Sequence, residues 1–156
     1  SVSAAQLDVA VLQFTELKSA DEINASLVGV SLSDMTNGDR TNTKIRALKG
    51  GQVLFAQSLS SAPNLHSYCR LSNNKVELDG SYNNGILSLK ITLSEEVNIG
   101  LRRLTSRIFE GSAPLPLGSS RVIAIRNIEG KSRSYTRGVV EIKNEFTCNL
   151  IVAQIK

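Results

Sequence analysis

Residues 121–156 read RVIAIRNIEGKSRSYTRGVVEIKNEFTCNLIVAQIK, a stretch dense in β-branched and aliphatic residues. Turn-forming residues separate its apolar runs, most clearly at Glu129-Gly130-Lys131. Apolar, β-branched runs bounded by turn residues are typical of strands. We therefore expect two or three long antiparallel strands in this stretch, with the rest of the chain packed onto them.

The remainder of the chain also has the pattern of short strands. Apolar runs recur between turn signals such as Asn83-Asn84-Gly85. Strands are predicted over residues 6–17, 23–32, 44–49, 52–59, 65–71, 75–78 and 86–93. The pattern indicates a mainly β fold, an antiparallel, jelly-roll-like β-sandwich or barrel of about 8–10 strands, with residues 1–156 as one domain. Leu7–Phe14 is apolar on both faces, which predicts burial on two sides or a subunit contact.

One short α-helix is predicted near residues 95–110. Apolar residues recur there at helical spacing, at Val97, Leu101, Leu104 and Ile108. Ser94 is a suitable N-cap before two glutamates. The alternative is a further strand in which Val97, Ile99 and Leu101 alternate.

Composition narrows the class of protein and its location. Hydrophobic residues make up 41% and charged residues 21% of the chain, as in ordinary globular proteins. Aromatic residues are 4%, which disfavours sugar-binding or base-stacking platforms. No apolar run reaches the length of a membrane-spanning helix, and no signal peptide is visible. We expect a virion or cytoplasmic location, with secretion as the alternative if a signal peptide has been removed.

Residues that support catalysis are scarce. His66 is the sole histidine, and we expect it to have a structural or surface role. No glycine-rich phosphate loop or nucleophile elbow is present. Cys69 and Cys148 lie in predicted strands, so free buried thiols are expected, with a disulfide as the alternative. We predict a protein that is not an enzyme and has no catalytic residues, no metal site and no cofactor.

Charge is distributed unevenly along the chain. Residues 1–98 carry 8 Lys/Arg against 10 Asp/Glu, and residues 99–156 carry 10 against 4, which gives the net +4. Between Lys131 and Arg137, cations alternate with hydroxyl residues, and Lys131, Arg133 and Arg137 are expected on one strand face with Tyr135. The predicted contacts to nucleic acid or to an acidic protein surface are Arg102, Arg103, Arg107, Arg121, Arg126, Lys131, Arg133, Tyr135 and Arg137. The alternative is a solvated edge strand whose charges prevent aggregation.

Three functions remain compatible with these features. We expect a non-enzymatic structural protein that assembles symmetrically with copies of itself, such as a viral or phage capsid, spike or tail-tube component. The second hypothesis is a β-barrel that binds nucleic acid through the basic 121–143 face. The third is a secreted binding module, such as a lectin or an effector, for which a Cys69–Cys148 disulfide would be characteristic.

Overall fold

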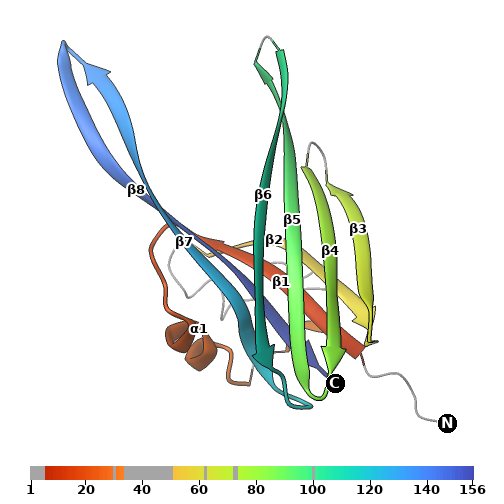
Figure 1. Cartoon of the computed structure of the whole chain (residues 1–156). Coiled ribbons are helices and arrows are strands. Elements are labelled where there is room, and N and C mark those ends of the chain that lie inside the picture. The colour runs from red at the N-terminus through yellow and green to blue at the C-terminus, as the bar shows by residue number, and fades with distance from the viewer. Residues whose placement is uncertain (1–5, 30, 34–50, 62, 72–73, 100) are drawn as a thin grey trace.

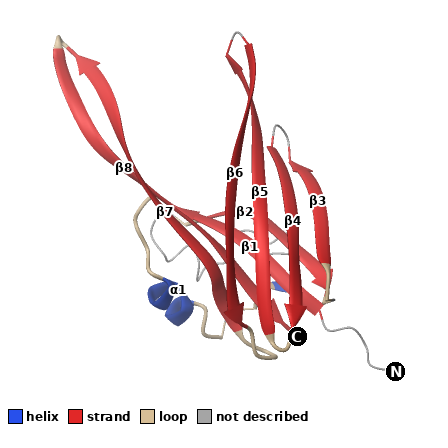
Figure 2. Ribbon diagram, in the orientation of Figure 1, coloured by secondary structure: helices blue, strands red, loops and turns tan. Residues whose placement is uncertain are grey.

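The computed structural model describes residues 6–29, 31–33, 51–61, 63–71, 74–99 and 101–156, without the side chains of residues 71, 74, 95–99 and 101–105. Strands dominate this part of the chain (Figure 2). In chain order, the elements are β1 (Gln6–Phe14), α1 (Ala20–Ser26), β2 (Gln52–Ser60), β3 (Leu65–Leu71), β4 (Asn74–Asn83), β5 (Ile86–Ile99), β6 (Leu101–Pro114), β7 (Ser120–Thr136) and β8 (Val139–Ile155).

The strands form two antiparallel four-stranded sheets that pack as a sandwich (Figure 1). Sheet A has the order β2-β1-β8-β7, and sheet B has the order β3-β4-β5-β6. The predicted mainly β, sandwich-type fold with antiparallel strands is therefore confirmed.

Sheet A is buried on both of its faces. The odd-numbered side chains of β1, including Leu7 and Val11, pack against sheet B in one apolar cluster. The even-numbered ones, including Leu12 and Phe14, join a second cluster under α1. Period-2 alternation thus sends every apolar residue of β1 into one core or the other. Of the two predicted explanations for this doubly apolar strand, burial on two sides is the correct one.

Helix α1 covers the outer face of sheet A. The Ser19 hydroxyl accepts a hydrogen bond from the Glu22 amide at 3.2 Å and caps the first turn. Ile23 and Leu27 lie four residues apart, and both are buried against the sheet. A strand over residues 23–32 was therefore a wrong prediction, because the capped helical turn buries the same apolar residues.

In the described residues, no helix is long and apolar enough to cross a membrane.

The helix predicted near residues 95–110 does not form. β5 and β6 are paired continuously from Ile86 with Pro114 to Ile99 with Leu101. A ladder of this length satisfies the backbone of the whole segment, and it overrides the coincidental helical spacing of the apolar residues. The alternative prediction of strand conformation at Val97, Ile99 and Leu101 is correct, but these residues do not share one strand, because β5 ends at Ile99 and β6 begins at Leu101. The strand predicted at 44–49 lies outside the described residues.

Two hairpin turns require residues with positive φ. Asn84 and Gly85, at φ 55° and 75°, join β4 to β5 at the predicted turn. Arg137 and Gly138, at φ 51° and 76°, join β7 to β8. Two central residues with positive φ are the mark of a type I′ hairpin. The turn predicted at Glu129–Lys131 was wrong, because β7 continues through Gly130, which pairs with Glu145.

The two cysteines are free. Cys148 is buried in the cluster under α1, whereas Cys69 lies at the margin of the cluster between the sheets. Sheet A separates the two thiols, which excludes a Cys69–Cys148 disulfide. The prediction of free thiols is confirmed for both residues, and that of burial for Cys148.

Candidate assembly interface

β7 and β8 continue beyond the core as a two-stranded ribbon, defined here as residues 127–145. The ribbon stands away from the rest of the fold (Figure 1). Every residue of β8 from 139 to 145 is exposed, and β7 is exposed from 129 to 136 except at half-buried Ser132. The same two strands are buried at their other ends, where Leu150 and Val152 are fully covered. The ribbon therefore gains little from tertiary packing.

Both edges of the ribbon are open in the part of the chain that the structure describes. β7 is the outer strand of sheet A, so its free edge has no neighbouring strand among the described residues. β8 has β1 as its second neighbour, but only from Cys148 to Ile155. An isolated two-stranded hairpin is marginally stable in water, and its unpaired backbone groups are a template for another strand. The ribbon is therefore suited to pairing with a further chain.

The register assigns the ribbon residues to two faces. Asn127 hydrogen-bonds the backbone of Lys18, its Nδ2 to the carbonyl oxygen at 3.0 Å, which places it on the α1 side of the sheet. By alternation, Lys131, Arg133 and Tyr135 lie on the same side, which we call the outer face. Their cross-strand partners on β8 are Asn144, Ile142 and Val140, respectively. The inner face is formed by Ser132, Ser134, Thr136, Val139, Glu141 and Lys143.

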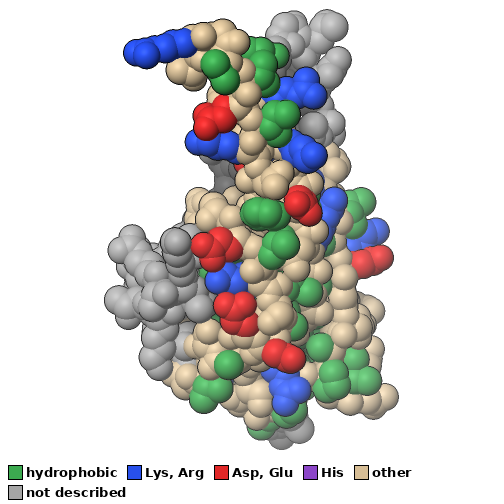
Figure 3. Space-filling view, turned by 90° about the vertical axis from the view of Figure 1, so that its left-hand side faces the viewer, with side chains coloured by type: hydrophobic (Ala, Val, Ile, Leu, Met, Phe, Trp, Pro, Cys, Tyr) green, Lys and Arg blue, Asp and Glu red, His purple; other side chains and the backbone are tan. Residues whose placement is uncertain are grey.

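The outer face combines apolar and basic side chains. Tyr135 is 72% exposed, Ile142 57% and Val140 49%, and Val139 on the inner face is 65% exposed. Figure 3 shows basic and acidic side chains interleaved with hydrophobic ones over the projecting part of the molecule. Within the described residues, no carboxylate forms an ion pair with Lys131 or Arg133. Clustered exposed apolar side chains of this kind mark interaction surfaces.

The structure brings together a minority of the predicted contact residues. Lys131, Arg133 and Tyr135 share the outer face, as predicted, but Arg137 does not, because it lies in the turn at positive φ. Arg126 lies on the opposite side, where its Nη1 donates to the Ile108 carbonyl of β6 at 3.4 Å.

The other four predicted contacts either lie away from the ribbon or have side chains that the structure does not describe. Arg121 is at the base of β7 beside α1 and lines a hollow there with Asn24 and Lys156. Arg107 is exposed on β6. The side chains of Arg102 and Arg103 lie outside the described residues. One continuous basic face over 121–143 therefore does not form.

Sequence reasoning missed the apolar part of the surface. Val139, Val140 and Ile142 were assigned to a strand, but their exposure was not foreseen. The residues opposite them on β7 could have indicated this exposure. Each of the three is paired across the two strands with a polar residue, a basic residue or Tyr135. An apolar residue opposite Arg133 or Thr136 indicates a surface without a core beneath it.

Comparison with known proteins gives likenesses at low similarity. No family model matches the chain, and no curated protein matches it. Among solved structures, the chain is similar to the type II secretin GspD from enteropathogenic Escherichia coli, with 12% identity and a TM-score of 0.38 over 99% of this chain and 70% of that one. It is similar to the Klebsiella pneumoniae type II secretion system outer membrane complex of PulD, PulS and the PulC HR domain, with 9% identity and a TM-score of 0.38 over 99% and 40%.

A third likeness is to the secretin β-barrel domain of InvG from the Salmonella SPI-1 injectisome, with 9% identity and a TM-score of 0.33 over 99% of this chain and 63% of that one. Of these three, two are matched over less than two thirds of their length. These secretins belong to bacterial secretion systems, and none is a virion protein. The expected assignment to a virion or capsid, and the expected virion or cytoplasmic location, are corrected by this finding.

Proposed function

We propose that this chain is a non-enzymatic structural subunit that assembles with copies of itself through the β7–β8 ribbon. The observation that carries the proposal is a ribbon with two open edges and an exposed apolar face, built from the same strands that form the buried core. Strand addition at the edges would satisfy the free backbone groups, and it would cover Tyr135, Val140 and Ile142.

The charges on the ribbon favour unlike edges as partners. Beyond Gly130, both charged residues of β7 are cations, Lys131 and Arg133, and they share one face. Two β7 edges that pair beyond Gly130 would therefore place like charges side by side, which is unfavourable. The β8 edge instead offers Val140, Ile142 and Asn144 on the same face, over which the aliphatic parts of Lys131 and Arg133 can lie.

This preference determines the kind of assembly. Contact between the β7 edge of one copy and the β8 edge of the next is heterologous, because each copy uses two different surfaces. Repeated heterologous contacts close into a ring or continue as a filament. We therefore expect a cyclic or helical homo-oligomer and not an isologous dimer.

Light scattering coupled to size-exclusion chromatography tests the proposal. The wild type is expected to elute as a discrete oligomer, and Val140→Ser with Ile142→Ser is expected to reduce it to a monomer. The matched control is Val28→Ser with Leu117→Ser, which removes side chains that are 77% and 74% exposed outside the ribbon. A monomeric wild type, or a ribbon variant with the wild-type mass, would contradict the proposal.

Nucleic-acid binding is a second candidate function, favoured by the shared face of Lys131, Arg133 and Tyr135. A cation row can track phosphates, and an exposed tyrosine can stack on a base. Lys131→Ala with Arg133→Ala should then weaken binding of a labelled single-stranded oligonucleotide and lower the salt slope by about 0.7 per lost contact. Absence of binding by the wild type at low salt would exclude this candidate.

A further inference from the structure

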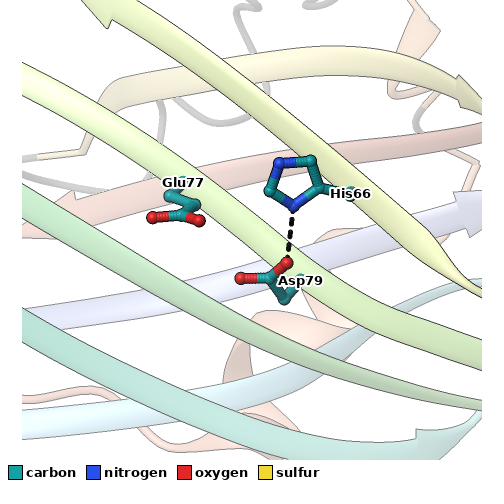
Figure 4. Close-up of side chains that lie close together, drawn as sticks. All are labelled: His66, Glu77 and Asp79. Atoms are coloured by element: carbon teal, nitrogen blue, oxygen red, sulfur yellow. Dashed lines mark hydrogen bonds and ion pairs between the residues drawn. The ribbon is translucent and has the colours of Figure 1, made fainter.

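Three side chains that can bind a metal gather on the outward face of sheet B, away from the ribbon (Figure 4). His66 on β3 is paired directly with Asp79 on β4, and its Nδ1 lies 2.6 Å from the Asp79 Oδ1. Glu77 precedes Asp79 by two residues on the same strand, so it lies on the same face. One ligand atom from each of the three side chains lies within 4.8 Å of the other two.

The backbone beneath this cluster is fixed by the core. Leu65, Val76 and Leu78 alternate with the three residues along β3 and β4, and all are buried between the sheets. The imidazole and the carboxylates therefore project from a rigid two-stranded platform, while the side chain of His66 is 63% exposed and that of Asp79 is 51% exposed. The platform holds the three groups together, and the exposed side chains can still rotate toward a ligand.

The charges in the cluster favour a cation. Among the described residues, no Lys or Arg forms an ion pair with Glu77 or Asp79, although Lys90 is opposite Asp79 in the register. Tyr68 is opposite Glu77 on the other strand. Among the described residues, His66 is the basic side chain that contacts Asp79, and a bound cation would balance the charge of the two carboxylates.

We propose that His66, Glu77 and Asp79 form a surface site for a divalent first-row transition-metal ion, with Zn²⁺ as the ion that fits best. Imidazole nitrogen and carboxylate oxygen are both ligand types that bind Zn²⁺ in proteins. Ca²⁺ and Mg²⁺ prefer oxygen ligands alone, so the imidazole selects against them. With metal–ligand distances of about 2.0–2.2 Å, the gap between Nδ1 and Oδ1 must widen to roughly 3.3 Å, which rotation of the exposed side chains permits.

Calorimetric titration of the full chain with ZnCl₂ tests the proposal. The wild type is expected to bind one Zn²⁺ per chain, and His66→Asn or Asp79→Asn is expected to weaken binding by ~10-fold or more. Glu110→Gln is the matched control, because this carboxylate is exposed on β6 in the same cross-strand row, opposite Lys90. It should leave the affinity unchanged, and CaCl₂ should give no comparable binding.

Nuclear magnetic resonance provides a second measurement that does not depend on the variants. His66 is the single histidine of the chain, so its ring signals are assigned without ambiguity. On addition of ZnCl₂, these signals should shift or broaden while the fold is retained. Unchanged ring signals at millimolar ZnCl₂, or equal affinity of wild type and His66→Asn, would overturn the proposal.

Discussion

The two ends of the β7–β8 strand pair differ in what surrounds them. At the core end, sheet B covers one face, α1 covers the other, and β1 pairs along β8. In the ribbon, the same strands have solvent on both faces and two open edges. A single continuous hairpin thus forms part of the buried core at one end and an uncovered surface at the other. The difference shows that burial, and not strand propensity, separates the structural part of the hairpin from the part available for assembly.

The largest difference between the two ends should appear on truncation of a large side chain. Leu150→Ala removes a fully buried side chain under α1 and should lower the free energy of unfolding by about 2–5 kcal/mol. Ile142→Ala, in the ribbon, should change the stability of the monomer by about 0.5 kcal/mol or less. Urea unfolding at low protein concentration measures both. Equal losses would mean that the ribbon is packed in the monomer.

Glycine substitutions give a second, smaller contrast. A Cβ on Gly111 of β6 would collide with the carbonyl of Ile123 and the side chain of Ala124, where the two sheets approach closely. Gly111→Ala should therefore cost about 1–3 kcal/mol. Gly130→Ala is the matched ribbon variant, because a Cβ there meets nothing within 4 Å. Thermal unfolding should show a lower midpoint for the first variant alone, and a neutral Gly111→Ala would contradict the close approach.

A substitution in the turn of the ribbon should change the stability of the ribbon alone. Arg137 has a φ of 51°, which asparagine adopts more readily than arginine. Arg137→Asn creates the Asn-Gly pair preferred in type I′ turns and should stabilise the hairpin by about 0.5 kcal/mol. Amide exchange in the ribbon should slow by about twofold, as expected for that energy. The core amides of β8 should be unaffected, and slower exchange there as well would contradict the separation of the two ends.

The smallest effect concerns the pKa of His66, which is paired with Asp79 on the exposed face of sheet B. Asp79 raises the pKa of His66 above 6.5, so Asp79→Asn should move it back toward that value in a nuclear magnetic resonance titration. Because the folded-state pKa is raised, the stabilisation from this contact is fully present below pH 6.5 and is lost as the pH rises through the raised pKa. An unchanged His66 pKa in Asp79→Asn would contradict the hydrogen bond.

Local patterns identified much of the fold. The alternation in β1 and the turn at Asn84-Gly85 follow from side-chain period and positive φ, both of which can be read from residue types. The helix near 95–110 was mispredicted because helical spacing and strand alternation coexist there, and only pairing with a distant strand distinguishes them. The capped helix at Ala20–Ser26 was missed because its apolar residues also suit a strand.

The candidate interface was predicted in part. Lys131, Arg133 and Tyr135 fall on one face by alternation alone. The exposure of Val140 and Ile142 could not be predicted in the same way, because their composition matches that of buried strands, and burial depends on what the fold places against them. For Leu7–Phe14, the sequence left open burial on two sides or a subunit contact, and the structure buries the apolar residues of this strand.

Hydrogen exchange measured by mass spectrometry on dilute and concentrated protein tests the role of the ribbon most directly. We predict that amides at 127–145 exchange rapidly in the dilute monomer and become protected as the oligomer forms. Amides at 148–155, which are already paired on both sides, should remain protected throughout. An oligomer whose ribbon still exchanges rapidly, with protection gained elsewhere, would contradict assembly through β7 and β8.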